Sequence, residues 1–429
     1  MAAPAHSVPA NSTRQGPSAT GSARRRGKAG QHPFTSNPTP SNQHVQVQVQ
    51  VQVQVQPVPD ASKSRRARKK PRSLPRRLKR RAIKHTWSIP LLLLVAIASL
   101  YALNPTESNV IHHFVFLSYR QDPDPAAPGA PAQYGKGLWD IAFVAFYTVA
   151  LSFMREFIMQ EVLRPWARVA GIRSRGKQLR FMEQMYTAIY FGVAGPAGLY
   201  VMSRSPVWYF NTTGMYELFP HRTHEAAFKT YYLIEAAYWA QQALVMLLGM
   251  EKPRKDFKEL VAHHIVTLAL IGLSYRFHFT YIGIAVYITH DISDFFLAVS
   301  KSLHYLDSTL VMPSYALNVG TWIYLRHYLN LRIIWSLLTE FRTVGPYELN
   351  WETQQYKCWI SNIVTFALLA MLQGLNLFWL YCLLRIAWKF LSTGEKKDDR
   401  SEESEPEDVA QHQNGHANGH TLANGNGGN

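Results

Sequence analysis

The stretch VAHHIVTLALIGLSYRFHFTYIGIAVYITHDISDFF, residues 261–296, decides the fold. It has the pattern of two apolar helices joined by a short turn, each long enough to cross a bilayer. Similar apolar runs with short polar connections continue along the chain, and many Trp and Tyr residues lie at their ends, as is typical of the water–lipid interface. We therefore expect an all-α, polytopic membrane protein whose helical bundle encloses an intramembrane cavity.

The formal net charge of +17 is concentrated at the N-terminus. Residues 1–84 contain eighteen Lys or Arg and a single acidic residue, Asp60, so the rest of the chain is balanced. The run KSRRARKKPRSLPRRLKRRAIK at 63–84 suits a nucleic-acid arm, a nuclear signal or a juxtamembrane cluster. Its position directly before the first apolar run favours the juxtamembrane cluster, which holds this end in the cytosol. Two cysteines, Cys358 and Cys382, are too few for a disulfide framework.

Composition divides the chain into four parts. They are a low-complexity basic arm (1–84), N-terminal spans with a cytosolic connector (85–178), a membrane domain (179–392) and an acidic tail (393–429). The arm and the tail lack hydrophobic periodicity and are predicted to be disordered, including the Val-Gln repeat at 45–56, which alternates like a strand but has no partner sheet. No apolar run precedes the end of the arm, so the first span is expected to act as the targeting signal.

Eight segments are predicted to cross the membrane: 87–104, 138–158, 184–202, 230–250, 259–275, 280–300, 314–338 and 360–389. An even number of spans returns the C-terminus to the cytosol. The basic connections 164–180 and 251–258 then also fall in the cytosol, as the positive-inside rule requires.

Three residues outside the spans are candidates for modification. The connection 203–229 would face the lumen and carries a glycosylation acceptor at Asn211. In the acidic tail, Ser404 has Glu407 three residues on, and Ser401 has Ser404 in the same place. Acid-directed kinases favour that spacing, so Ser401 and Ser404 are phosphorylation candidates. An unmodified, solvated acidic tail is the alternative.

Five ionisable residues of the opening stretch are predicted to share one half of the bilayer. At ~1.5 Å of rise per residue, His263 and His264 lie about 6 to 8 Å from the cytosolic end, and His290, Asp291 and Asp294 about 10 to 17 Å. Spacings of three and four residues place His290 and Asp291 beside Asp294 on one helix face. Isolated carboxylates in hydrocarbon cost several kcal/mol, so we expect this face to meet a protein-lined cavity or partner cations.

The cluster has three chemical interpretations. Histidine and aspartate can act as packing contacts between helices. Imidazoles also suit zinc, haem or iron, but a di-iron oxygenase needs many more histidines in repeated boxes, so no metal site is predicted. The third interpretation is acid–base or nucleophilic catalysis, in which a carboxylate orients an imidazole that takes a proton or carries an acyl group. Paired histidines and two aspartates meeting at one depth favour the third.

The residues around this cluster resemble the ceramide synthases, which carry the Lag1 motif within a TLC (TRAM-Lag1-CLN8) domain. The resemblance runs over most of residues 180–390. It includes KTYYLIEAAYWAQQ (229–242), EKPRKDFKELVAHHIVT (251–267), YITHDISDFFLAVSKSLHY (287–305) and QGLNLFW (373–379). Animal members generally begin one span later and often insert a homeobox-like segment that is absent here. The extra span and the basic arm resemble fungal members.

The resemblance implies a TLC-type bundle at 179–392 that transfers an acyl group from a fatty acyl-CoA to a sphingoid base in the endoplasmic reticulum, with no cofactor besides the acyl-CoA. In that family the paired histidines and both aspartates are required for activity. This carries over onto His263, His264, Asp291 and Asp294, with His290 beside them. It also implies a homo- or heterodimer, a small single-span accessory subunit and no nucleic-acid partner.

Substrate-binding candidates lie near these residues. Arg254, Lys255 and Asp256 stand at the cytosolic end, where cations would meet the polyphosphate of CoA. Tyr231, Tyr232 and Trp239 are pocket candidates, although aromatic residues at helical spacing often serve only packing. The resemblance further suggests that the connection 342–359 helps to set the acyl chain length.

Two functions from other classes stay open at this point. A non-enzymatic TLC protein could sense or handle lipid, since a fold does not imply one function. A transporter could use the histidines and aspartates as a proton relay, in which case flux would be proton-coupled and independent of acyl-CoA. The combination of HH with HDxxD favours the enzyme.

Overall fold

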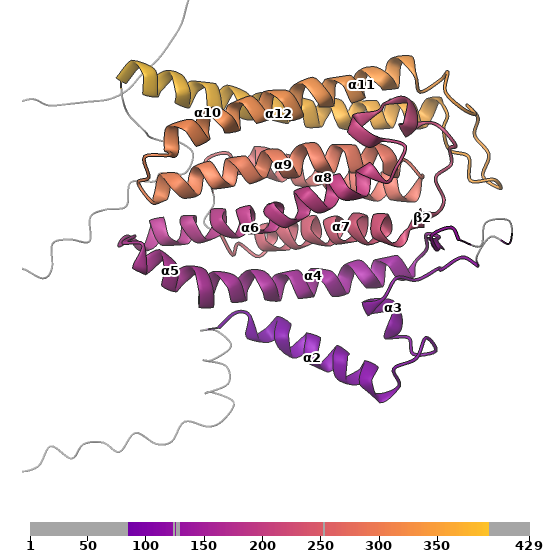
Figure 1. The fold of residues 1–429 in the computed structure, drawn as a ribbon, viewed down its shortest axis with the longest axis horizontal. Helices are drawn as coiled ribbons and strands as arrows, with labels where there is room; N and C mark the ends of the chain where they lie inside the picture. Colours follow the sequence, from indigo (N-terminus) through magenta and orange to yellow (C-terminus); the bar gives the residue numbers. More distant parts are fainter. Residues whose placement is uncertain (1–84, 123–124, 126–128, 252–253, 394–429) are drawn as a thin grey trace, which may run out of the picture. The chain divides into compact units, whose positions relative to one another are not determined.

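The computed structural model describes residues 85–122, 125, 129–251 and 254–393 (Figure 1). These residues are mostly helical. The predictions for the basic arm, the Val-Gln repeat, Ser401 and Ser404 concern residues outside the described ranges.

The described part of the chain begins with two helices, a short strand and a long helical stretch, and it continues through the helices that carry the motifs. The elements are, in order, α2 (Ser88–Leu103), α3 (His112–Val115), β1 (Gln133–Tyr134), α4 (Trp139–Phe157), the π-helical η1 (Ile158–Leu163), α5 (Arg164–Val169), α6 (Arg175–Ser203), the 3₁₀ turns η2 (Trp208–Phe210) and η3 (Thr213–Met215), β2 (His224–Glu225), α7 (Ala226–Leu247), α8 (Phe257–Arg276), α9 (Thr280–Tyr305), α10 (Val311–Trp322), the π-helical η4 (Ile323–Leu329), α11 (Asn330–Thr339) and α12 (Trp359–Thr393).

Within the described ranges, four helical stretches are long and apolar enough to cross a membrane. They are Trp139–Val169, Phe257–Arg276, Thr280–Tyr305 and Trp359–Ser392. A helix satisfies its own backbone hydrogen bonds, which is what lipid demands of a spanning segment. The chain is therefore a multi-pass membrane protein.

Several helices extend beyond the predicted spans. The stretch that begins with α4 continues to Val169 rather than ending at residue 158. Helix α6 begins at Arg175 rather than at residue 184, because the Ser174 side chain caps it by accepting from the Lys177 backbone N–H. Helix α9 continues to Tyr305 rather than ending at residue 300. Hydropathy detects only the apolar part of a helix, whereas polar residues can extend it beyond the membrane.

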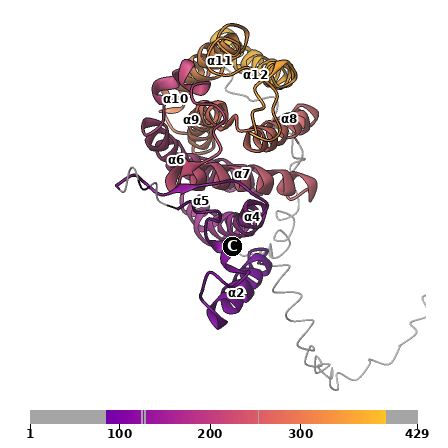
Figure 2. The same cartoon turned by 90° about the vertical axis from the view of Figure 1, so that its right-hand side faces the viewer.

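The helices pack side by side in layers (Figures 1 and 2). Helix α6 packs along α9, α4 packs against α7 and α2, and α12 packs against α8 and α11. Helices α8 and α9 are joined only by Phe277–Phe279 and contact each other, which confirms the predicted hairpin. The α5–α6 turn and the start of α8 lie at one end of the bundle, here named the α7–α8 end (Figure 1). The opposite end, with the turn at Phe277–Phe279, is named the α8–α9 end.

A buried ion pair ties the loops to α7. Lys229, fully buried, pairs with Asp140 of α4 at 2.7 Å and donates to the backbone oxygens of Ser118 and Gly135. Strands β1 and β2 form an antiparallel pair beside it, with Tyr134 opposite His224. The connection before α4 and the start of α7 are thus held together.

The predicted glycosylation acceptor lies in an ordered connection. The exposed Asn211 donates from Nδ2 to Pro206 O at 3.2 Å, and Thr213 donates to Glu340 at 2.9 Å. Glycosylation of Asn211 stays a prediction.

Buried histidines gather in the loops at the α8–α9 end. Lys136 donates to His221 O at 2.8 Å and lies 3.3 Å from His278 Nδ1, while His278 Nε2 lies 3.1 Å from Gln354 Oε1. Burial lowers the pKa of His221 to about 4 and the pKa of His278 to about 3. Both imidazoles are therefore neutral in the folded protein at neutral pH.

This cluster predicts a loss of stability in acid. The unfolded chain protonates these histidines at the ordinary pKa of about 6.5, so the unfolded state binds more protons below that pH. The free energy of unfolding does not depend on these two histidines above about pH 6.5. Below that pH it declines toward pH 4, by on the order of 1.4 kcal/mol per pH unit and per histidine. Thermal unfolding in detergent between pH 8 and 4 measures this decline.

The double variant His221→Gln/His278→Gln should flatten the pH dependence of the melting temperature. The variant His304→Gln, at the other end of α9, is the control and should keep the wild-type slope. An unchanged slope in the double variant contradicts the assignment.

Candidate functional site

A buried arginine organises the polar residues of α9. Arg326 of η4, only 2% exposed, pairs with Asp294 at 2.6 Å and donates to Ser293 Oγ and to His290 O. It also donates to Asn376 Oδ1 of α12 at 3.2 Å. Its guanidinium lies 4.0 Å from the ring centroid of Trp322. One side chain therefore joins η4, α9 and α12.

Two buried carboxyl groups beside this network, those of Asp291 and Glu235, have tyrosine partners. Tyr231 donates to Asp291 Oδ2 at 2.7 Å, and Tyr190 donates to Glu235 Oε1 at 2.9 Å. Asp291 is fully buried and Glu235 nearly so. In the described part of the chain, the second oxygen of each carboxyl group has no hydrogen-bond partner. The ring of Tyr190 stacks on Tyr238 at 3.7 Å, which holds its hydroxyl toward Glu235.

Each histidine of the cluster has its own environment. His290 donates from Nδ1 to Val286 O at 2.8 Å, which leaves Nε2 to accept from Asn376 Nδ2 at 3.3 Å. His264 donates from Nδ1 to Leu260 O at 2.9 Å. His263 differs, because Nδ1 has no partner among the described residues and Nε2 lies 3.5 Å from Thr267 Oγ1. Its imidazole is the least constrained by hydrogen bonds.

Aromatic rings rather than carboxylates hold His263. The ring centroids of Trp239 and Trp379 lie 5.5 Å and 5.2 Å from that of His263, both edge to face. Trp379 also donates to Asp256 Oδ2 at 3.1 Å, and Asp256 accepts twice from Arg254. The α7–α8 connection is thereby fastened to α12 beside His263.

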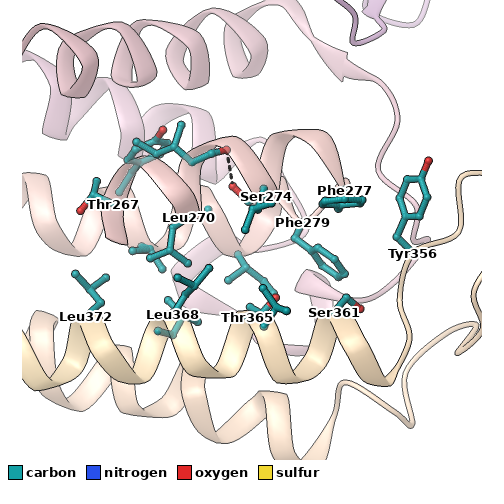
Figure 3. A pocket seen from close by; sticks show the side chains of 18 of the residues that line it. Thr267, Leu270, Ser274, Phe277, Phe279, Tyr356, Ser361, Thr365, Leu368 and Leu372 are labelled. Atoms are coloured by element: carbon teal, nitrogen blue, oxygen red, sulfur yellow. Dashed lines mark hydrogen bonds between the residues drawn. The ribbon is translucent and has the colours of Figure 1, made fainter. Parts of the chain in front are cut away.

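An apolar cavity of about 310 Å³ extends between α8 and α12 (Figure 3). Thr267, Leu270 and Ser274 line it from α8, at the helical spacing that places side chains on one face. The facing stripe on α12 consists of Ser361, Thr365, Leu368 and Leu372. The α8–α9 end of the cavity is lined by Phe277, Phe279, Leu349, Trp351 and Tyr356. From His263 to Phe277 the cavity follows α8 for about 21 Å.

A second cavity of about 270 Å³ lies at the α7–α8 end. It is named the polar cavity because charged side chains line it together with apolar ones. Its charged residues come from α6, the α7–α8 connection, α9 and η4: Glu183, Glu251, Arg254, Asp294, Lys301 and Arg326. His264 lines this cavity only, and His290 lines only the apolar one. Two residues line both, His263 and Trp239. His263 therefore stands where an apolar space meets a charged one.

The structure corrects one expectation about these residues. An aspartate was expected to orient an imidazole, but Asp291 bonds to Tyr231 and Asp294 pairs with Arg326. The backbone carbonyl of Val286 and the amide of Asn376 orient His290 instead. The reason is the tertiary arrangement: η4 brings a cation to the face of α9 that the aspartates occupy.

Comparison with known proteins gives a consistent result. Residues 180–385 match the TLC domain family. The chain is 57% identical over 327 residues to the sphingosine N-acyltransferase-like protein FUM17 of Gibberella moniliformis, covering 76% of this chain and 84% of that protein. It is 50% identical over 328 residues to the sphingosine N-acyltransferase lac1 of Schizosaccharomyces pombe, covering 76% and 83%. It is 50% identical over 326 residues to the ceramide synthase LAG1 of Saccharomyces cerevisiae, covering 76% and 78%.

The chain belongs to the sphingosine N-acyltransferase, or ceramide synthase, family. Within this family member, the five candidate residues His263, His264, His290, Asp291 and Asp294 lie on two neighbouring helices, α8 and α9. Four of them line one or both cavities. Asp291 lines neither and accepts a hydrogen bond from Tyr231.

The substrate-binding candidates of this N-acyltransferase family member occupy different places. Tyr232 and Trp239 line the apolar cavity, whereas Tyr231 contacts Asp291. Arg254 lines the polar cavity with its guanidinium bound to Asp256. Lys255 is exposed next to it.

Sequence reasoning missed the polar residues that other helices supply to this site. They are Arg326 and His327 of η4, Gln373 and Asn376 of α12 and Glu235 of α7. The sequence does carry a signal for two of them, because Arg326 and His327 lie at the centre of the predicted span 314–338. Ionisable side chains at that depth cost free energy in lipid and therefore face the protein interior by default. Glu235, Gln373 and Asn376 lie within the motifs of the family resemblance, which assigns them no role.

The pair of Arg326 and Asp294 predicts a stability pattern. Arg326→Met leaves Asp294 without its cation, and loss of one partner of a buried pair costs about 3 kcal/mol, the low end of the usual range because the Asp294 side chain is 20% exposed. The double variant Arg326→Met/Asp294→Asn should lose less than the single one. Thermal unfolding in detergent measures both.

A surface pair provides the matched control. Arg204→Met breaks the exposed pair with Glu225 and should cost no more than about 1 kcal/mol. A double variant that is less stable than Arg326→Met would contradict the compensation between Arg326 and Asp294.

Proposed function

We propose that this protein is a ceramide synthase that transfers the acyl group of a fatty acyl-CoA to the amino group of a sphingoid base, sphinganine or phytosphingosine. The products are the (dihydro- or phyto-)ceramide and CoA. The observation that carries the proposal is the position of His263 between the apolar and the polar cavity. The apolar cavity suits a hydrocarbon chain, and the polar one suits the CoA moiety. The thioester carbon then lies beside His263.

The imidazole of His263 supplies the reactive lone pair. Sphingoid amines are mostly protonated at neutral pH, so a base must remove a proton before nitrogen attacks the thioester carbon. As the C–N bond forms, the C–S bond breaks and the nitrogen loses a second proton. Of the two protons, one goes to the departing CoA thiolate and the other to solvent. In a two-step variant, His263 first attacks the thioester and carries the acyl group to the amine. Intact-mass measurement after incubation with acyl-CoA alone separates the two routes, because only the second adds the mass of an acyl group.

The remaining polar residues have supporting roles in this proposal. His264 and Asp294 line the polar cavity near the thioester. Asn376 and Arg326 hold His290, so that its imidazole faces the apolar cavity in one tautomer. Arg254 and Lys255 are available to the phosphates of CoA. No cofactor besides the acyl-CoA enters the scheme.

We further propose that the chain crosses the endoplasmic reticulum membrane eight times and that both termini lie in the cytosol. In this arrangement α2, α6, α7 and the continuous helix α10–η4–α11 cross in addition to the four apolar stretches. The bundle then encloses both cavities within the membrane, with the α7–α8 end in the cytosol. The basic connections at 164–180 and 251–258 support this orientation. Association with a second ceramide synthase chain, or with a small single-span subunit, rests on the family resemblance alone.

The proposed role of His263 predicts that acyl transfer is lost when its imidazole is removed. His263→Ala should lower ceramide formation by about 10²-fold or more, the usual contribution of a positioned acid–base group. The assay is conversion of labelled sphinganine by microsomes at matched expression, with a series of acyl-CoAs. His304→Ala, on the last turn of α9, is the matched control and should keep wild-type activity.

The outcome separates this function from lipid handling without chemistry. If folded wild type forms no ceramide with any acyl-CoA or candidate subunit, the non-enzymatic alternative replaces the proposal. If His263→Ala matches wild type, another residue supplies the base.

The apolar cavity also predicts a length limit for the acyl chain. Residues of the connection 342–359, Leu349, Trp351 and Tyr356, line its α8–α9 end. Arg276 donates to the Tyr356 hydroxyl at 3.4 Å, and His278 stacks on the Tyr356 ring at 5.8 Å. These contacts hold the end of the cavity in place.

Thr365→Trp should shift the preference toward shorter acyl-CoAs. Thr365 lines the middle of the cavity, and filling a packed space costs about 1–3 kcal/mol, so the longest chains should lose at least about tenfold in kcat/KM. Ile363→Trp, on the opposite and exposed face of α12, is the matched control. An unchanged order of chain lengths in Thr365→Trp would place the acyl chain elsewhere.

A further inference from the structure

A cleft between α5 and α6 is lined by arginines and belongs to neither cavity described above. It measures about 430 Å³ and is lined by Arg164, Arg168, Arg175, Gln178, Leu179 and Met182. Arg164 and Arg168 are four residues apart on α5, and the other four lie at helical spacing on α6, so two helix faces look at each other across the cleft.

A rigid turn sets the distance between these faces. Ile172 N–H donates to Ala167 O and Gly171 N–H to Arg168 O, the two bonds of a Schellman motif, with Gly171 at φ +84°. Gln178 Nε2 then donates to Ile172 O at 2.6 Å, which fastens α6 to the turn. The arginines are therefore displayed by a built structure and not by a loose loop.

The charge of this cleft is largely uncompensated. The run 164–180 contains six Lys or Arg and no acidic residue. Within the described ranges, no carboxylate forms an ion pair with Arg168 or Arg175, and Arg164 has only Glu161 as a nearby opposite charge. Arg175 also opens the first turn of the 29-residue helix α6, where the helix dipole adds positive potential.

The cleft faces away from the route of the acyl-CoA. At about 100° per residue, the α6 residues that line it point about 140° away from Glu183, Gln184 and Thr187, which line the polar cavity. Apolar groups adjoin the arginines instead: Leu179 is 41% exposed, Met182 forms the floor, and the exposed Trp166 lies between Arg164 and Arg168 in sequence. Cationic groups beside exposed apolar side chains suit the headgroup region of a bilayer.

We propose that Arg164, Arg168 and Arg175 form a phosphate-binding site that takes the headgroup of an anionic phospholipid. Arginine forks match phosphate oxygens in pairs, and the apolar rim lies where the glycerol and acyl chains of the lipid would continue. The site would anchor the α5–α6 turn to the membrane surface. It is independent of acyl transfer.

The experiment measures binding to the full-length protein in a neutral detergent. The titrants are dioctanoyl phosphatidic acid, dioctanoyl phosphatidylcholine, inorganic phosphate and CoA. We expect saturable binding of phosphatidic acid, little binding of phosphatidylcholine and a loss of at least about tenfold in affinity for Arg168→Gln/Arg175→Gln. The matched control is Arg173→Gln/Lys177→Gln, which removes the same charge from the same turn outside the cleft.

Each titration and each double variant tests a different part of the proposal. Equal loss of affinity in the two double variants would show nonspecific attraction to the basic turn and overturn the site, as would equal binding of both lipids. Arginine-dependent binding of inorganic phosphate or CoA without binding of phosphatidic acid would keep the phosphate site and overturn the headgroup. Both double variants should retain acyl transfer, so failure of the proposed function leaves this test intact.

Discussion

The ion pair between Arg326 and Asp294 is the constraint on which the rest of the site depends. A carboxylate and a guanidinium are each expensive in a low-dielectric interior, and they can be kept there only together and with their remaining hydrogen bonds made. Arg326 meets that condition by bonding to Ser293 and to His290 O on α9 and to Asn376 on α12. The π-helical turn η4 contains Arg326, and such turns in α-helices are frequent at functional sites.

The consequence of this pairing is a chain of contacts across three helices. Asp294 accepts from Arg326, Arg326 donates to Asn376, and Asn376 donates to His290. Each step fixes the orientation of the next group, so an imidazole facing the apolar cavity is positioned by a carboxylate that lines the polar one. Such a relay replaces the direct bond between histidine and aspartate that acid–base chemistry usually employs.

Sequence alone was sufficient for the parts of the site that lie close together in the chain. The short turn before Thr280 required α8 and α9 to be an antiparallel pair, and periodicity put His290, Asp291 and Asp294 on one face. Sequence did not reveal what faces them, because the partners Tyr231, Arg326 and Asn376 come from three other helices. Periodicity identifies a buried face but not the helix that covers it. Polar helix extensions were missed for a related reason, since Arg175 to Glu183 is helical but not apolar.

The two cavities explain why His263 has so few hydrogen bonds. A histidine fixed at both nitrogens, as His290 is, has no lone pair to offer a substrate. His263 is held by the rings of Trp239 and Trp379, which orient an imidazole without occupying its nitrogens. Trp379 is itself fastened through Asp256 to Arg254 at the mouth of the polar cavity. A phosphate that bound Arg254 in place of Asp256 would change the hydrogen bond that Asp256 accepts from Trp379. Because the Trp379 ring packs on His263, occupation of the polar cavity is coupled to the position of the imidazole.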